Sequence, residues 1–117
     1  MRNGIGNIGI YSMGAKDSKN FATIKVGNSS KKDGLYSIGM ATGYYDTENG
    51  TIQNVGKVIN ENTGKIEVEG EFGVGMYAVG TGSTAINNGE IILKGKNSVG
   101  MFLDHNAIGI NNGTILG

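Results

Sequence analysis

Residues 87–91 read Asn-Asn-Gly-Glu-Ile, and the chain repeats them at residues 111–115 as Asn-Asn-Gly-Thr-Ile. Residues 62–66, Asn-Thr-Gly-Lys-Ile, carry a weaker copy before them. A second marker, Val-Gly-Met-Tyr at residues 74–77, returns as Val-Gly-Met-Phe at residues 99–102. Two unrelated markers that share one period of about 24–25 residues indicate a repeat architecture.

Within each repeat the local pattern is that of short strands. Residues 65–70, Lys-Ile-Glu-Val-Glu-Gly, alternate apolar and charged side chains, which is the period of a half-buried β-strand. Asn-Gly steps at residues 49–50, 88–89 and 112–113 favour tight turns between such strands. The sequence therefore predicts an all-β fold, a parallel β-helix in which the 117 residues make roughly five coils of about 24–25 residues.

The composition excludes several classes of function. The chain has 22 glycines, no proline and no cysteine, so disulfide scaffolds, zinc ribbons and thiol nucleophiles are ruled out. Ten basic and ten acidic side chains give a net charge of zero, which disfavours nucleic acid as a partner. The longest apolar run, Ile91 to Leu93, is far too short for a membrane helix, so we expect no insertion of this segment into a membrane.

The repeats are less regular in the first part of the chain. The marker glycine recurs at Gly9, Gly39, Gly75 and Gly100, and its first two separations are longer than its last. We therefore expect one β-helical segment over residues 1–117, with irregular coils and loops in residues 1–45 and regular repeats in residues 46–117. The inserted loops are expected at residues 14–20, 28–34 and 43–49. Because the sequence opens and stops within repeats, we interpret it as a segment of a longer protein.

The repeat alignment predicts the core. Aliphatic side chains at equivalent places of successive coils should stack in buried columns, since each coil covers its neighbour. The expected core residues are Ile66, Val68, Ile91, Leu93 and Ile115. The same alignment stacks Met76 on Met101 and Tyr77 on Phe102.

The alignment also predicts ladders of polar side chains along the axis. The shift that relates the two Gly-Met markers places Glu69 beside Lys94 and Glu71 beside Lys96, and opposite charges on adjacent strands support this register. Amide side chains can hydrogen-bond along the axis when they stack at the strand spacing. The expected amide column consists of Asn62, Asn87 and Asn111.

No motif in the sequence carries chemistry strongly. Residues 4–9 match Gly-x-Gly-x-x-Gly, but a dinucleotide site needs a strand before and a helix after that motif. His105, the single histidine, is expected in a surface turn. A calcium site could form from Glu67, Glu69 and Glu71 with Asp46 or Glu48. Two of these glutamates are already accounted for by Lys94 and Lys96 of the next coil. We therefore predict no catalytic residue, no cofactor and no bound metal, and hence no enzyme.

Three strings in the second half carry a family resemblance. Residues 85–91 (Ala-Ile-Asn-Asn-Gly-Glu-Ile), 95–102 (Gly-Lys-Asn-Ser-Val-Gly-Met-Phe) and 110–115 (Ile-Asn-Asn-Gly-Thr-Ile) resemble the passenger-domain repeats of large type V autotransporter adhesins, especially the fusobacterial-type outer-membrane autotransporters. The resemblance covers residues 35–117 well and residues 1–34 loosely. It implies a right-handed parallel β-helix displayed at the surface of a Gram-negative bacterium by type V secretion.

The resemblance also implies a non-catalytic stalk or adhesin segment. Its partner would be a protein or glycan receptor on host cells or other bacteria, bound through the inserted loops. Independently of the resemblance, unpaired strand edges at the ends of the segment predict that it associates end to end. Two alternatives remain open at this stage. One is a catalytic β-helix acting on polysaccharide as a lyase or glycoside hydrolase, and the other is a binding fibre similar to a phage tail-spike.

Overall fold

The computed structural model describes residues 5–12, 17–27 and 36–117, and these residues form fourteen β-strands. Twelve of the strands build three parallel sheets of four strands, and the remaining two form a separate antiparallel hairpin. The part of the chain that the structure describes contains no helix that could span a membrane. The predicted parallel β-helix is confirmed.

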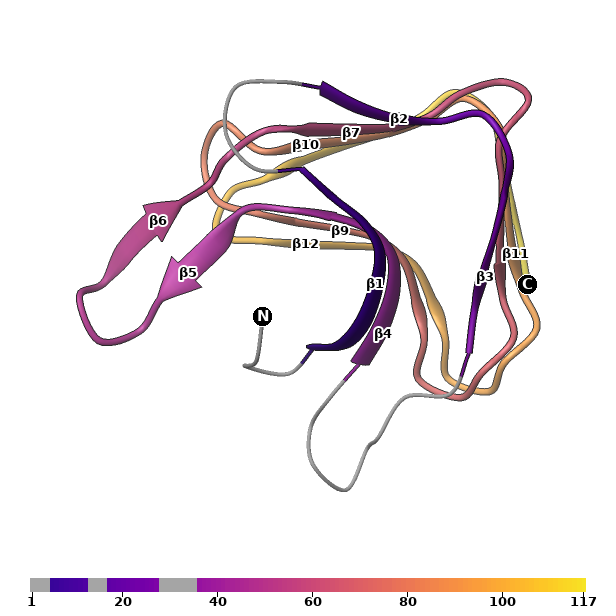
Figure 1. The fold of residues 1–117 in the computed structure, drawn as a ribbon, viewed down its shortest axis with the longest axis horizontal. Coiled ribbons are helices and arrows are strands. Elements are labelled where there is room, and N and C mark those ends of the chain that lie inside the picture. Colours follow the sequence, from indigo (N-terminus) through magenta and orange to yellow (C-terminus); the bar gives the residue numbers. More distant parts are fainter. Residues whose placement is uncertain (1–4, 13–16, 28–35) are drawn as a thin grey trace.

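Each of the three sheets collects one strand from every coil. Sheet A contains β1 (Ile5–Ser12), β4 (Tyr36–Thr42), β9 (Val74–Val79) and β12 (Val99–Asp104). Sheet B contains β2 (Asp17–Asn20), β7 (Lys57–Asn60), β10 (Thr84–Asn87) and β13 (Ile108–Asn111). Sheet C contains β3 (Thr23–Val26), β8 (Lys65–Val68), β11 (Glu90–Leu93) and β14 (Thr114–Leu116). Figure 1 looks along the stack, with sheet B at the top, sheet C at the right and sheet A below.

The described strands make four coils. Coil 1 contains β1 to β3, coil 2 contains β4, β7 and β8, coil 3 contains β9 to β11, and coil 4 contains β12 to β14. The expectation of roughly five coils was wrong, because coils 1 and 2 take up more of the chain than the regular repeat does. Coil 2 carries the hairpin of β5 (Tyr44–Asp46) and β6 (Thr51–Gln53), which projects from the left side of Figure 1.

The hairpin lies at one of the three expected insertions. Residues 43–49 were expected as an inserted loop, and they form the start and tip of this hairpin. The boundary at residue 45 falls inside β5, so the irregular part extends to the end of β6. Residues 17–20, expected in a loop, form strand β2 instead, because they pair in register with β7. The expected loop at residues 28–34 lies outside the described residues.

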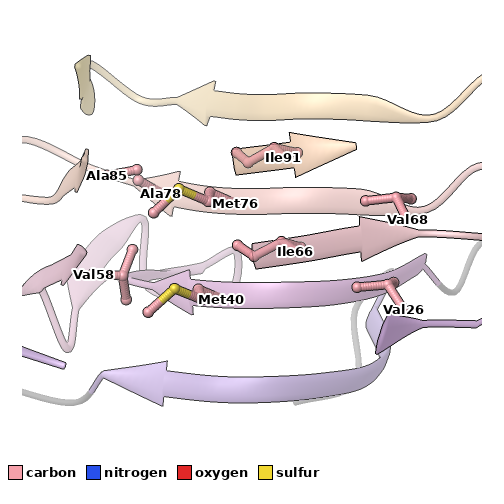
Figure 2. Close-up of a cluster of buried hydrophobic side chains, with 9 residues drawn as sticks. All are labelled: Val26, Met40, Val58, Ile66, Val68, Met76, Ala78, Ala85 and Ile91. Carbon is pink, nitrogen blue, oxygen red and sulfur yellow. The ribbon is translucent and has the colours of Figure 1, made fainter. Parts of the chain in front are cut away.

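The core consists of columns that run along the axis. Ile24, Ile66, Ile91 and Ile115 occupy one column of sheet C, and Ile66 and Ile91 are fully buried. Val26, Val68 and Leu93 form the neighbouring column. Figure 2 shows Val26 below Val68, Ile66 below Ile91 and Met40 below Met76 on successive coils. Leu93 and Ile115 are only half-buried and pack at the border of the cluster.

The isoleucine column leaves no space for a side chain at the marker glycines Gly39 and Gly75 of sheet A. A Cβ atom at Gly75 would lie 2.9 Å from Ile91 Cγ2 and 2.7 Å from the backbone oxygen of Gly100. Gly39 faces Ile66 in the same way, at 2.8 Å from its Cγ2. A side chain at these positions would overpack the core, so the Gly-Met marker and the isoleucine column depend on each other.

Candidate functional site

The strand register places the predicted columns as follows. Met76 pairs with Met101 and Tyr77 with Phe102, and the two rings stack with centroids 5.2 Å apart. Ile66 pairs with Ile91, which confirms the shift predicted from the sequence. These contacts join parallel strands of successive coils, so residues that are one repeat apart in the sequence are neighbours on adjacent strands.

An asparagine ladder runs through the turns between sheets B and C. The Nδ2 atom of Asn20 donates to Asn60 Oδ1, that of Asn60 to Asn87 Oδ1, and that of Asn87 to Asn111 Oδ1, each at 2.9 Å. Asn60 and Asn87 also donate to backbone oxygens of the next coil, at Glu90 and Thr114 respectively. Both side chains are fully buried, so these bonds satisfy amides that would otherwise cost about 1 to 3 kcal/mol each.

The ladder contains Asn60 in place of the predicted Asn62. Asn62 stands four positions before Ile66, just as Asn87 stands four positions before Ile91, and the prediction rests on this equal spacing. The turn after β7 is longer by two positions, so Asn62 is exposed in that turn and Asn60 pairs with Asn87. The dipeptide Ile-Asn ends the sheet B strand at residues 59–60, 86–87 and 110–111. An alignment on this dipeptide predicts Asn60 as the ladder residue.

The acidic and basic side chains of sheet C meet at Lys94. Its Nζ atom lies 3.5 Å from Glu67 Oε2 and 4.0 Å from Glu69 Oε2, both on the preceding coil. The predicted neighbourhood of Glu69 and Lys94 is therefore present. Glu71 and Lys96 form no ion pair among the described residues. They lie in stacked turns, where the Phe72 N–H donates to the Lys96 oxygen.

A second polar row accompanies the ladder on the surface. Lys19 Nζ lies 3.9 Å from Glu61 Oε2, Asn88 Nδ2 donates to Glu61 Oε1 at 3.4 Å, and Asn112 Nδ2 donates to Asn88 Oδ1 at 3.0 Å. This row joins all four coils at one corner. It presents amide and charged groups to solvent.

Among the described residues, the β5–β6 hairpin is the largest departure from the regular coil. Tyr45 stacks on His105 of coil 4, with ring centroids 4.1 Å apart and an angle of 20° between the planes. Ile52 of β6, which pairs with Tyr45, lies against Gly80 of coil 3. A Cβ atom at Gly80 would meet Ile52 Cγ2. The hairpin therefore leans along the corner of the two following coils, and two side chains anchor it.

The base of the hairpin is closed by backbone and tyrosine bonds. The Gly43 N–H donates to the Asn54 oxygen at 3.1 Å, and the Tyr11 hydroxyl donates to the Gly43 oxygen at 3.1 Å. Gly43 has a φ of 85°, a conformation that favours glycine. Burial raises the pKa of the Tyr11 hydroxyl, and a side-chain hydrogen bond with Asn54 partly opposes that rise.

The tip of the hairpin is organised by Asp46. Its carboxylate accepts from the Glu48 N–H at 3.0 Å, from the Asn49 N–H at 3.3 Å and from Asn49 Nδ2 at 2.7 Å. The side-chain bond with Asn49 is the main cause that lowers the pKa of Asp46. Residues 47–50 are exposed, and Gly50 completes the turn with a φ of 66°. The tip is thus an ordered loop that presents polar groups to solvent.

Of the residues considered for chemistry, His105 lies in a turn and part of the glycine motif lies in strand β1. His105 is exposed in a turn with a φ of 52°, as predicted, and its Nδ1 atom lies 3.3 Å from Asp104 Oδ1. Gly6 and Gly9 of the glycine motif lie within strand β1, whereas Gly4 is outside the described residues. No group of three or more His, Cys, Asp or Glu side chains that could hold a metal ion occurs among the described residues.

Sequence reasoning did not find the pairing of Tyr45 with His105, which joins residues far apart in the chain. The only signal was the Asn49-Gly50 step between two short β-like runs.

Comparison with protein-family models identifies one region of similarity. Residues 1–114 match the model described as the BigA third pectate lyase-like domain. No curated protein and no solved structure matches the chain.

Proposed function

Because the chain belongs to the family of BigA third pectate lyase-like domains, which occur in bacterial surface proteins, we propose that it is a non-catalytic β-helical stalk segment that presents the β5–β6 hairpin for adhesion. The observation that carries this proposal is the anchored hairpin. Tyr45 and Ile52 hold it against coils 3 and 4, and the tip around Glu48 remains exposed.

A rigid projecting loop suits a binding role. Tyr45 stacks on His105, and Ile52 contacts coil 3. Because these contacts already restrict the hairpin, it has less conformational entropy to lose on binding. The tip offers a carboxylate at Glu48, an amide at Asn49 and hydroxyls at Thr47 and Thr51. These groups suit a polar receptor surface, either a glycan or a protein, on host cells or other bacteria.

The arrangement of the acidic side chains supports a non-catalytic role. Glu67 and Glu69 flank Lys94 on an exposed sheet face, and Glu90 lies 4.0 Å from Lys65. A glycosidase would need two carboxylates across a substrate groove at catalytic separation. The family description refers to the fold of the pectate lyases, so activity on polysaccharide is the competing function and is tested directly below.

The proposal extends to the mode of display. We infer that the full protein is an adhesin of the autotransporter type, secreted by the type V route and exposed at the outer membrane of a Gram-negative bacterium. The support is the membership in a surface-protein family together with the repeat pattern described above.

The test compares two exposed carboxylates in a binding assay. Fluorescently labelled chain is added to cultured epithelial cells and to immobilised glycans, as the parent and as the variants Glu48→Gln at the hairpin tip and Glu71→Gln in the turn after β8. We expect Glu48→Gln to reduce binding several-fold and Glu71→Gln to leave it unchanged. Equal binding by all three chains, or no binding by the parent, would contradict the role of the hairpin.

The competing function has its own readout. The parent chain is incubated with polygalacturonate with and without calcium, and the absorbance of unsaturated uronate products is followed. We expect no release of product, and sustained release would replace the adhesive proposal by a catalytic one.

A further inference from the structure

Three Asn-Gly steps lie among the described residues, at 49–50, 88–89 and 112–113. Such steps are prone to deamidation, because glycine has no side chain to hinder attack by its backbone nitrogen on Cγ of the preceding asparagine. The attack releases ammonia and closes a succinimide ring, and water then opens the ring to aspartate or isoaspartate. One amide and one water thus give one carboxyl group and one ammonia.

The three steps lie in different environments. In the stacked turns, Gly89 is buried, and Asn112 Nδ2 donates to Asn88 Oδ1 of the preceding coil at 3.0 Å. Neighbouring coils therefore restrain the steps at 88–89 and 112–113. Residues 47–50 form the exposed tip of the β5–β6 hairpin, which projects at the left of Figure 1. The step at 49–50 is open to water and is restrained by contacts within the tip.

Asp46 holds both groups that would have to react. The Gly50 N–H donates to the backbone oxygen of Asp46 at 2.7 Å, and Asn49 Nδ2 donates to Asp46 Oδ2 at 2.7 Å. Ring closure requires a base to remove the Gly50 amide proton and the Asn49 side chain to bring Cγ to the Gly50 nitrogen. The first event breaks one of these bonds and the second disrupts the other. The observed tip is therefore a conformation that resists the attack.

The carboxylate of Asp46 is not placed to assist the reaction. It accepts from the backbone of Glu48 and Asn49 and from Asn49 Nδ2, whereas the Gly50 N–H bonds to the backbone oxygen instead. It is thus not the base that removes the Gly50 proton. The side-chain bond with Asn49 lowers the pKa of Asp46, so at neutral pH the carboxylate has no proton to give to the departing ammonia.

We infer that Asn49 is a deamidation site whose rate is set by its contacts with Asp46, and that its conversion is an irreversible switch which opens the hairpin tip. The product has a carboxylate where the Asn49 amide now donates to Asp46 Oδ2. Two carboxylates at this separation repel each other. Asp46 forms no ion pair within the described structure that would offset the repulsion.

The isoaspartate product disturbs the tip further, because its backbone runs through the side chain and is longer by a methylene group. The turn that the Gly50 N–H closes on the Asp46 oxygen then no longer fits its four residues, 47–50. The inference does not rest on the adhesive role, since its readouts follow the hairpin itself and need no receptor.

The first experiment measures deamidation at each Asn-Gly step by mass spectrometry of peptides after incubation at neutral pH. We expect Asp46→Ala to react at Asn49 several-fold faster than the parent, with unchanged rates at Asn88 and Asn112. Thr47→Ala changes an exposed tip residue that makes none of these bonds and should match the parent. Equal rates at Asn49 in the parent and in Asp46→Ala would overturn the inference.

The second experiment needs no substitution, so it decides the question even if Asp46→Ala does not fold. The parent is incubated in native buffer and in enough urea to unfold it, and circular dichroism confirms both states. Unfolding removes the contacts with Asp46, so Asn49 should react several-fold faster in urea. A native rate as fast as the unfolded one would show that the tip gives no protection.

The third experiment tests the consequence of the modification. Asn49→Asp reproduces the charge of the aspartate product, and Thr47→Asp adds the same charge away from the contact with Asp46. We expect hydrogen exchange of the Gly50 amide to become several-fold faster in Asn49→Asp and to stay unchanged in Thr47→Asp, while strand β8 remains protected in both. Unchanged protection of Gly50 in Asn49→Asp would rule out the switch.

Discussion

Coils 3 and 4 carry nearly the same sequence but have different environments. Asn-Asn-Gly-Glu-Ile of coil 3 and Asn-Asn-Gly-Thr-Ile of coil 4 adopt the same turn and strand, and Ile91 pairs directly with Ile115. Ile91 is fully buried, however, and Ile115 is only half-buried. In a solenoid the contribution of a repeat depends on the neighbours that cover it as much as on its own residues.

The largest expected difference concerns the isoleucine column. Ile91→Ala should lower the free energy of unfolding by about 2 to 5 kcal/mol, because it leaves a cavity between covered coils. Ile115→Ala should cost about 1 to 2 kcal/mol, since its side chain is partly solvated already. Urea unfolding followed by circular dichroism measures both values. Equal losses would mean that coil 4 is covered in solution.

The glycine column gives the next largest difference. Gly75→Ala brings a Cβ atom against the backbone oxygen of Gly100 and should cost about 2 to 3 kcal/mol. At Gly100 the nearest atoms belong only to the Ile115 side chain, the closest being Cγ2 at 2.8 Å. That side chain can move, so Gly100→Ala should cost less than about 1 kcal/mol. Denaturation midpoints of the two variants decide the comparison, and a costlier Gly100→Ala would contradict it.

The asparagine ladder should show the same contrast on a smaller scale. Asn87→Ala removes a buried amide that bonds to Asn60, Asn111 and the Thr114 oxygen, and should cost about 1 to 2 kcal/mol. Asn111→Ala removes one exposed end of the ladder and should cost about 0.5 kcal/mol. Amide hydrogen exchange in the turns adds a local readout. Fast exchange confined to the variant's own turn would show that the ladder does not connect the coils.

The surface charges should contribute least to the stability of the coils. Lys94→Gln separates Lys94 from Glu67 and Glu69 and should cost less than about 1 kcal/mol, because all three side chains are partly exposed. The loss should shrink as salt is added. Lys96→Gln, which breaks no ion pair within the described structure, is the matched control. A loss independent of salt would indicate packing of the lysine stem instead.

A last comparison sets the hairpin against the solenoid. The hydrogen bonds that lower the pKa of Asp46 favour its charged form in the folded hairpin. Their contribution is therefore present above the pKa of an unfolded aspartate, and it is lost as the pH falls through the lower folded value. Amide exchange at Asn49 should rise relative to its intrinsic rate in that acid range, while strand β8 stays protected. Unchanged protection of Asn49 would show that Asp46 does not order the tip.

Much of the fold could be predicted from the sequence because the determinants are local and recur at a constant spacing. Alternating residues in 65–70 indicate a strand, Asn-Gly steps indicate turns, and the shift between the Gly-Met markers sets the register of coils 3 and 4. The opposite charges of Glu69 and Lys94 indicate the same shift for coils 2 and 3. In an in-register solenoid, residues that are one period apart in the sequence lie side by side on adjacent coils.

Other features were decided only by the tertiary structure. Asn60 replaces Asn62 in the ladder because turn length varies between coils, and β2 forms on residues 17–20 because β7 offers an edge in register. The stack of Tyr45 on His105 depends on how a hairpin leans across two later coils, a geometry with no sequence period. Burial within one column likewise depends on coverage by a neighbouring coil. Local patterns determine strands and register, whereas insertions and uncovered ends acquire their environment only when the coils are stacked.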